Sequence, residues 1–341
     1  MSIRIQKIVG GCIGLSEKRL LKTVQGCTKE KFTLKMLRSI PRDAPENQIS
    51  LSIRPLLGKH LLMNAATDVT LGVGRDKYVH YAIDLESGEK EILFVGELLA
   101  PELFFLKKLK GAPEFVQMKT YLMVGKKYYI ITQYCNRGDW LQEILTRTLS
   151  FQDTLRAAED VARGVEKIHK QEIVHRDLKL NNLFIHKTEE GVIHGVIGDF
   201  NFMDQKLYED EEIRGLLGVA MQVSPERAKQ VTQKEGGEKQ YIHPVKEDIW
   251  MLGLSFFYWF KGGVFKWHQG LREFADRDQE AIERCAKLEQ SEFSEEIRKS
   301  KLPPFLIPLI ESMLQIDPEK RATASTVHSY LVEISKVVES V

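Results

Sequence analysis

One stretch of the chain combines residue types and spacing that could do chemistry: Ile173–Ile185, which reads Ile-Val-His-Arg-Asp-Leu-Lys-Leu-Asn-Asn-Leu-Phe-Ile. Asp177 can accept a proton, Lys179 can bind an anion, and Asn182 offers a carbonyl oxygen to a hard cation. Apolar residues flank this polar group, so we expect buried strand-like segments to hold both of its ends. Phosphoryl transfer requires an oriented hydroxyl, a neutralised phosphate and a bound Mg²⁺, and the stretch predicts that chemistry.

The eight residues from His175 to Asn182 resemble the catalytic loop of protein kinases, whose pattern is H-R-D-L-K-x-x-N. The resemblance implies that Asp177 orients the acceptor hydroxyl, that Lys179 neutralises phosphate charge and that Asn182 holds Mg²⁺. The lysine two residues after the aspartate favours serine or threonine over tyrosine as the acceptor. The alternative is a polar turn between two strands, and the family's other motifs test it.

A G-x-G pattern occurs at Gly72 and Gly74, with Leu71 before it and Val79 after it. It resembles the glycine-rich loop of the same family, in which backbone amides approach the phosphates of ATP because glycine has no side chain in the way. Lys77 stands where the family has a third glycine. The alternative is a simple glycine turn.

The segment from Val79 to Val95 is predicted to form a β-hairpin with its turn at Glu86–Glu89. In the family, the second strand of this hairpin ends in V-A-I-K, and its lysine binds the α- and β-phosphates. That position falls on Phe94 here, and a rival alignment that uses Tyr81–Asp84 also lacks a lysine. The missing lysine is the chain's most consequential departure from the family.

Lys77 is the best candidate for the missing cation, because a long side chain at the start of the hairpin can turn inward toward Phe94. The with-no-lysine kinases are similar at this one position. Lys90 is the rival candidate, but it lies four residues before Phe94 and is expected to face solvent. The remaining alternative is that Lys77 is a surface lysine on a lobe that binds no ATP.

Glu97–Leu109 has helical periodicity and carries Glu102. It resembles the kinase αC helix, which implies that Glu102 pairs with the phosphate-binding lysine, here Lys77. Pro101 suits a first helical turn, so we expect this helix to be shortened at its start. The alternative is an exposed glutamate without a partner.

The strand predicted at Tyr128–Cys135 resembles the one that leads to the hinge between the two kinase lobes. The resemblance implies that Thr132 lines the adenine pocket and that the backbone from Gln133 to Cys135 faces the base. The resemblance also implies that Phe184, which follows the catalytic loop, contacts the nucleotide.

Val196–Asn201 reads Val-Ile-Gly-Asp-Phe-Asn and resembles the family's D-F-G, which implies that Asp199 is a second Mg²⁺ ligand. Asn201 replaces the glycine, and we expect it to keep the turn because asparagine tolerates a left-handed backbone. The alternative for Asp199 is an ordinary aspartate at the end of a strand.

Further motifs bear on the fold more than on the chemistry. Phe151–Lys170 is predicted to be an amphipathic helix. Asp248 stands in the place of the family's aspartate that braces the catalytic loop, and Arg321 in that of the arginine that pairs with Glu226. Val219 stands where serine/threonine kinases usually have threonine, which weakens the assignment of the acceptor hydroxyl.

Arg176, beside the catalytic aspartate, usually marks kinases whose activation loop must present a phosphate to it. Between Asp199 and Val223 the chain has no serine or threonine, and Tyr208 is its only tyrosine. The carboxylates of Glu209–Glu212 can meet Arg176 instead, so we predict activity without phosphorylation of this loop. A solvated acidic loop is the alternative.

Composition sets the remaining bounds. The 341 residues are 43% hydrophobic and 28% charged, and the net charge of +1 gives no overall attraction to nucleic acid or membrane. The four cysteines show no C-x-x-C spacing, which favours a reducing compartment, and the cytoplasm is the expected location. The longest apolar stretch, Trp250–Phe260, is too short to span a bilayer and predicts a buried helix.

The resemblance covers roughly residues 60–335 and implies an α+β, bilobal protein-kinase fold, with an N-lobe at 51–135, a C-lobe at 136–341 and ATP between them. Residues 1–50 are a basic extension, which is either a solvated face or a docking segment for an acidic partner. The predicted function is transfer of the γ-phosphate of Mg-ATP to a serine or threonine of a protein substrate. The alternatives are a pseudokinase that serves as an ATP-binding or scaffolding module, and a small-molecule phosphotransferase.

Overall fold

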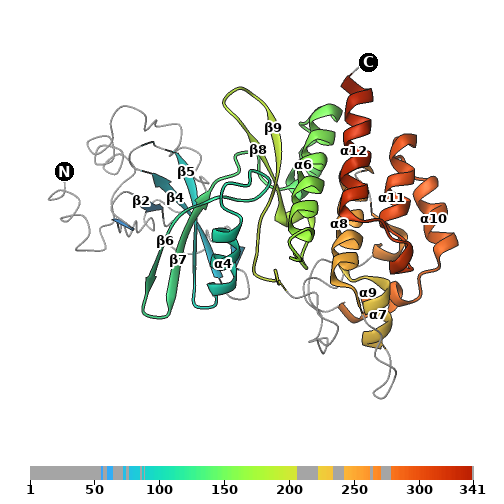
Figure 1. Ribbon diagram of the computed structural model, residues 1–341, viewed down its shortest axis with the longest axis horizontal. Coiled ribbons are helices and arrows are strands. Elements are labelled where there is room, and N and C mark those ends of the chain that lie inside the picture. Colours follow the sequence, from blue (N-terminus) through green and yellow to red (C-terminus); the bar gives the residue numbers. More distant parts are fainter. Residues whose placement is uncertain are drawn as a thin grey trace. The chain divides into compact units, whose positions relative to one another are not determined.

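The computed structural model of the chain divides into two compact units. The first runs up to Gly111 and resumes at Gln117–Tyr134, and the second comprises Ala112–Val116 and everything from Cys135 onward. Figure 1 labels most of the helices and strands of both units. The structure describes residues 55–56, 60–63, 72–73, 77–84, 87, 89–205, 222–232, 242–261, 264–269 and 278–339.

An antiparallel sheet of seven strands makes up most of the described part of the first unit. Its strand order is β1-β2-β4-β5-β7-β6, and β3 also pairs with β4. The strands are β1 (Pro55–Leu56), β2 (His60–Met63), β3 (Gly72–Val73), β4 (Lys77–Asp84), β5 (Lys90–Gly96), β6 (Met118–Val124) and β7 (Lys127–Gln133).

The predicted hairpin is confirmed, because β4 and β5 pair in antiparallel register from Lys77 opposite Gly96 to Ile83 opposite Lys90. The predicted helix after it is also confirmed as α4 (Ala100–Lys108), which has a proline in its first turn and therefore starts late. Its glutamate, Glu102, is buried and contacts the face of the sheet that carries Lys77.

The second unit is mainly helical, and it carries one short hairpin. The hairpin strands are β8 (Leu183–Lys187) and β9 (Ile193–Ile197). The α-helices are α5 (Trp140–Thr146), α6 (Phe151–His169), α7 (Pro225–Thr232), α8 (Pro244–Lys261), α9 (Asp278–Ala286), α10 (Gln290–Arg298), α11 (Ile307–Met313) and α12 (Ala324–Glu339). Short 3-10 turns are η1 (Leu180–Asn182), η3 (Lys266–His268), η4 (Pro304–Leu306) and η5 (Pro318–Lys320).

The core of the second unit forms around α8, whose residues from Ile249 to Trp259 are almost all buried. Trp140 of α5 stacks on Trp259 with ring centroids 4.3 Å apart. A helix that is apolar on every side belongs inside a protein, so the buried helix predicted from this stretch is confirmed. Within the described ranges, no helix is long and apolar enough to cross a membrane.

The helix predicted at Phe151–Lys170 is confirmed as α6, and it supports the hairpin that follows it. A Cβ atom on Gly195 of β9 would lie 2.1 Å from the Ala157 carbonyl oxygen of α6, so only glycine permits this close approach. On another side α6 lies beside α12 (Figure 1). A sheet unit followed by a helical unit confirms the predicted α+β class.

Candidate active site

The polar loop that carries Asp177 is held at both ends by backbone pairing in the second unit. Val174 and Asp204 exchange two backbone hydrogen bonds, of 3.0 and 3.1 Å. Behind the loop, Leu183 begins β8, which pairs with β9. Val174, Leu183 and Ile185 are fully buried, so the predicted buried segments on either side of the loop are confirmed.

Asp177 is 1% exposed, and the two polar residues that the sequence places beside it bind the same carboxylate oxygen. Lys179 Nζ lies 2.9 Å and Asn182 Nδ2 lies 2.7 Å from Oδ2. The second oxygen, Oδ1, is buried and has no donor in the part of the chain that the structure describes. A carboxylate fixed at one oxygen and without a donor at the other is positioned to accept the proton of a bound hydroxyl.

Burial raises the pKa of Asp177 above its ordinary value. Lys179 lowers this pKa through its charge and its hydrogen bond, whereas the charge of Asp199 raises it. The pKa nevertheless stays above the ordinary value, because the loss of water around the carboxylate outweighs the lysine. A carboxylate of raised pKa is a stronger proton acceptor.

The backbone brings Asn182 close to the residue before Asp199, since the Gly198 amide donates to the Asn182 carbonyl at 2.9 Å. Asn182 Nδ2 donates to the backbone oxygen of Asp177 at 2.8 Å, and it also donates to the Asp177 carboxylate. These two bonds fix the amide, so that its own oxygen faces away from them. An amide oxygen and a carboxylate are ligands of the kind that Mg²⁺ prefers.

The described ranges contain no group of three or more His, Cys, Asp or Glu side chains that could hold a metal ion. Mg²⁺ at Asn182 and Asp199 would therefore need further oxygen ligands from phosphate groups or water. The left-handed backbone expected at Asn201 lies instead on Asp199, whose φ is 62°. The expected turn at Asn201 is present, since the Met203 amide donates to the Phe200 carbonyl at 3.3 Å across it, and the left-handed residue is the aspartate, whose short polar side chain also tolerates this conformation.

Asp248 of α8 braces the loop, as predicted, by accepting hydrogen bonds from the backbone amides of His175 and Arg176, both at 2.7 Å. His169 Nε2 lies 2.9 Å from the same carboxylate. Burial alone would raise the pKa of Asp248, but these hydrogen bonds and the histidine charges lower it below its ordinary value. The role of His169 could not be predicted from sequence, because a histidine at the end of an amphipathic helix carries no distinguishing signal.

Arg176 has a carboxylate partner that the sequence analysis also missed. Its Nη1 donates to Asp204 Oδ2 at 3.0 Å, and the two side chains are 15% and 29% exposed. Asp204 lies five residues after Asp199, and this short spacing is the sequence feature that could have pointed to Asp204 as the partner of Arg176. The predicted partners at Glu209–Glu212, together with Tyr208, lie outside the described residues.

In the first unit, Lys77 lies against Glu102 and Phe94. Lys77 Nζ is 2.9 and 3.0 Å from the two carboxylate oxygens of Glu102. It also lies 4.5 Å from the centroid of the Phe94 ring. The Lys77 and Glu102 side chains are 7% and 1% exposed, so Lys77 is buried rather than on the surface.

Lys90, the rival candidate, is half-buried, and its Nζ lies 5.5 Å from the centroid of the Tyr134 ring. Burial lowers its pKa. The expectation that Lys90 faces solvent is therefore wrong, because the aromatic ring lies alongside it. Four residues of extended strand correspond to about 13 Å, so Lys90 sits too far from Phe94 to replace Lys77.

The residues expected to contact a nucleotide are found in both units. In the first unit, Gly72 of β3 pairs with the half-buried Val79 of β4. Thr132 of β7 is fully buried, and the next side chain, Gln133, accepts a hydrogen bond from the Gln117 amide at 3.0 Å.

In the second unit, Cys135 is buried and Phe184 is half-buried. A Cβ atom on Gly198 would lie 2.8 Å from the Phe184 ring, so a larger residue there would displace the ring. Leu71 and Gly74, the other two predicted nucleotide contacts, lie outside the described residues.

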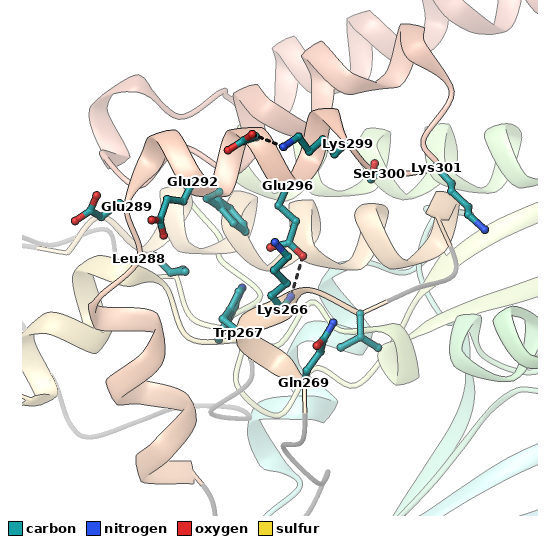
Figure 2. A pocket seen from close by; sticks show the side chains of 13 residues that line it. Lys266, Trp267, Gln269, Leu288, Glu289, Glu292, Glu296, Lys299, Ser300 and Lys301 are labelled. Carbon is teal, nitrogen blue, oxygen red and sulfur yellow. Dashed lines mark hydrogen bonds and ion pairs between the residues drawn. The ribbon is translucent and has the colours of Figure 1, made fainter.

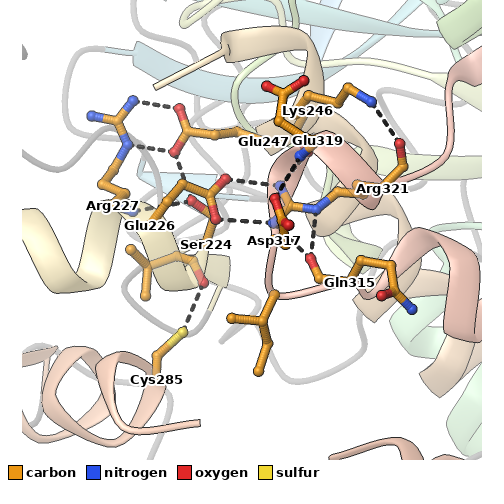
Figure 3. Close-up of polar contacts among 12 residues, drawn as sticks. Ser224, Glu226, Arg227, Lys246, Glu247, Cys285, Gln315, Asp317, Glu319 and Arg321 are labelled. Carbon is orange, nitrogen blue, oxygen red and sulfur yellow. Dashed lines mark hydrogen bonds and ion pairs between the residues drawn. The ribbon is translucent and has the colours of Figure 1, made fainter. Parts of the chain in front are cut away.

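A second network of charges connects α7 and α8 with Arg321, which directly follows η5 (Figure 3). Arg321 donates to both carboxylate oxygens of Glu226, at 2.8 and 2.9 Å, which confirms the predicted pair. Arg321 also donates to the backbone carbonyls of Gln315 and Lys246, and its Cζ lies 5.2 Å from the Trp250 ring centroid. Such a fully hydrogen-bonded buried arginine organises the fold.

The same network contains a pair that the sequence did not predict. Arg227 Nε donates to Glu247 Oε1 at 2.5 Å, its Nη2 binds the other oxygen, and the Ser224 hydroxyl donates to Oε1 at 3.1 Å. Because the two residues lie 20 positions apart, no local pattern could have paired them.

A groove of about 920 Å³ lies in the second unit between η3 and α10 (Figure 2). Trp267, Leu288 and Phe293 form apolar lining, and both glutamates and lysines stand around them. None of the predicted site residues lines this groove, so we do not assign it to phosphoryl transfer.

Comparison with known proteins gives a family and several relatives. The profile of the protein kinase domain matches residues 68–331. Ribosomal protein S6 kinase alpha-1 of Homo sapiens is 26% identical over 311 residues, which cover 87% of this chain and 40% of that protein. Serine/threonine-protein kinase PLK2 of Mus musculus is 26% identical over 234 residues, covering 67% of this chain and 30% of that protein. This chain spans less than half the length of either relative.

Proposed function

The chain belongs to the protein kinase domain family, and from this membership we propose that it transfers the γ-phosphate of ATP to a serine or threonine hydroxyl of a protein. Its fold is the bilobal kinase fold, with a small antiparallel-sheet lobe and a larger helical lobe. The observation that carries the proposal is the buried carboxylate of Asp177, held by Lys179 and Asn182. One of the two relatives named above, PLK2, is a serine/threonine-protein kinase by name, which supports the choice of acceptor.

In this proposal Asp177 orients the acceptor hydroxyl and takes its proton through Oδ1, the carboxylate oxygen to which no described residue donates. Lys179, whose side chain is 24% exposed, reaches the transferred phosphate. Asn182 and Asp199 hold Mg²⁺, which when bound supplies positive charge to the phosphate oxygens.

Lys77 takes the place of the family's strand lysine in the proposed site. Its pairing with Glu102 through both carboxylate oxygens supports this role, because the family pairs its phosphate-binding lysine with the αC glutamate. Leu71, Gly72, Gly74, Val79, Thr132, Gln133, Cys135 and Phe184 remain the proposed contacts of the nucleotide.

We assign residues 51–135 to the N-lobe and 136–341 to the C-lobe as part of the same proposal. Ala112–Val116, although it precedes two N-lobe strands, packs with the second unit. For the basic segment 1–50 we propose an acidic partner, since opposite charges attract at a protein surface.

A pseudokinase is the second candidate, and Phe94 in the place of the phosphate-binding lysine favours it. Such a protein would bind ATP or serve as a scaffold without transferring phosphate. Asp177, Asn182 and Asp199 favour the enzyme, because a chain released from catalysis has no reason to bury the polar side chains of Asp177 and Asn182 and to keep Asp199 after them.

Transfer of ³²P from ATP to a generic protein substrate in the presence of Mg²⁺ separates the two candidates. We expect wild type to incorporate label and Asp177→Asn, which keeps the side-chain shape, to lose about 10²- to 10⁴-fold in rate. Both proteins should bind Mg-ATP equally. Equal incorporation by the two proteins would reject the role of Asp177, and ATP binding without transfer by wild type would favour the pseudokinase.

A further inference from the structure

The strand register sets the position of Lys77 relative to Phe94. In the pairing of β4 with β5, Lys77 lies opposite Gly96 and Val79 lies opposite Phe94. Side chains alternate along a strand, so these four positions share one face of the sheet, and Lys77 and Phe94 are diagonal neighbours on it. Gly96 has no side chain, which leaves space for the lysine stem to lean toward the ring.

The contact between the two side chains has the geometry of a cation–π interaction. Lys77 Nζ lies 4.5 Å from the ring centroid, within the roughly 6 Å over which such attraction acts. Phe94 itself stands between Val79 on β4 and the fully buried Ile130 on β7, so its neighbours hold the ring in place.

The ammonium of Lys77 also contacts a carboxylate, that of Glu102. Glu102 approaches Nζ with both oxygens, at 2.9 and 3.0 Å, and it comes from α4 rather than from the sheet. The ring and the carboxylate therefore constrain the cation from two different elements. Because Lys77 is only 7% exposed, water screens these attractions weakly.

We propose that Phe94 is a positioning residue for ATP binding, whose ring face holds the ammonium of Lys77 in place for the α- and β-phosphates. This inference rests on the proposed function of Lys77. It means that the aromatic residue at the family's lysine position compensates for the lost lysine rather than merely filling its space. A lysine at position 94 would instead bring a second cation toward Glu102 and compete with Lys77 for it.

Fluorination of the ring tests the proposal, because fluorine withdraws electron density from the ring face and changes the ring's shape little. In the full 341-residue chain, Phe94 is replaced by phenylalanine carrying one, two or three fluorine atoms, and Mg-ATP binding is measured by calorimetry. We expect stepwise weaker binding along the series. Phe94→Leu should weaken binding about 2- to 30-fold in total, and Phe94→Tyr should bind like wild type.

Two controls separate this role from a general effect on packing. In a Lys77→Met background the fluorine series should have no further effect, since the cation is gone. Tyr121→Leu removes a second ring of the same unit, which lies 4.1 Å from Lys107 Nζ and is 40% exposed. This variant should bind Mg-ATP within about twofold of wild type, and thermal unfolding of every variant reports on the fold.

The outcomes distinguish this inference from the proposed function. Binding that does not change along the fluorine series overturns the inference and leaves the ³²P result untouched. Stepwise weakening in a protein that transfers no phosphate supports the inference and rejects the catalytic proposal. A wild-type protein that binds no Mg-ATP overturns both.

Discussion

Two buried cations, Arg321 in the second unit and Lys77 in the first, have similar surroundings, but we predict different roles for them. Each binds both oxygens of a glutamate, and each lies near an aromatic ring, Trp250 for the arginine and Phe94 for the lysine. Arg321 also donates to backbone carbonyls, so its planar fork joins separate segments of the chain. A lysine ammonium is compact and can rotate a proton toward an incoming anion, which suits a binding site.

Both cations are buried, and we predict that Arg321 mainly stabilises the fold whereas Lys77 mainly binds phosphate. Arginine's fixed donors are matched to fixed acceptors, so removing it should cost stability first. The Phe94 ring and the Glu102 carboxylate orient the single charge of Lys77. Substitution of Lys77 should therefore reduce activity more than stability. The following experiments test this difference, starting with the largest expected effect.

Arg321→Met should lower the free energy of unfolding by about 3–5 kcal/mol, because it leaves the Glu226 carboxylate buried without its cation. Chemical denaturation measures the loss. The matched control is Arg298→Met, since the Arg298 side chain is 66% exposed and its loss should cost under about 1 kcal/mol. Equal losses in the two variants would show that Arg321 is not a structural centre.

Lys77→Met should reduce phosphoryl transfer by about 10²- to 10³-fold, the usual effect of removing one electrostatic contact to a reacting group. Circular dichroism verifies that the variant used in the assay is folded. Lys90→Met is the control and should keep nearly full activity, because Lys90 lies beside Tyr134 rather than Glu102. If Lys77→Met transferred phosphate at the wild-type rate, the predicted difference in role between Arg321 and Lys77 would be wrong.

Asp204→Asn tests an ion pair of intermediate exposure, the one with Arg176 beside the catalytic loop. We expect transfer to fall roughly three- to tenfold, which corresponds to about 1 kcal/mol for a partly screened pair. Wild-type activity should also survive phosphatase treatment, since a carboxylate already meets the arginine. Loss of activity on phosphatase treatment would instead show that the arginine needs a phosphate.

The smallest effect concerns Glu166, which joins α6 to α12 through His328. The hydrogen bond from Lys170, with a further one from His328, lowers the pKa of Glu166 from 4.5 to about 2. Because the folded-state pKa lies below the unfolded one, the carboxylate stabilises the fold above about pH 4.5, and this stability is lost as the pH falls toward 2.

Glu166→Gln should therefore be less stable than wild type at pH 6, and the difference should shrink at pH 3. We expect a difference under about 1 kcal/mol, since Lys170 is 68% exposed and screened by water. Chemical denaturation at the two pH values measures it. A difference that is the same at both would mean that the pair contributes nothing to acid stability.

Several elements could be predicted from sequence because their signals are local. The hairpin, α4 and α6 follow from periodicity within about 20 residues, and the Asp248 and Arg321 contacts follow from motifs of fixed order. The packing of Ala112–Val116 could not be predicted in this way. It depends on Glu114 binding Arg163 and Lys167, at 2.7 and 2.6 Å, and those partners lie 49 and 53 residues away.

The sequence by itself determined which chemical groups are available: an aspartate, a lysine and an asparagine in one short loop, and a phenylalanine, Phe94, at the position that we align with the family's lysine. Only the tertiary structure decided how these groups behave. The raised pKa of Asp177 comes from burial, and the partner of Arg176 is an aspartate 28 residues away. Lys77 turns inward because strand register places it beside Phe94 and α4 supplies Glu102. Burial and charge pairing depend on distances in space, which residue order alone does not specify.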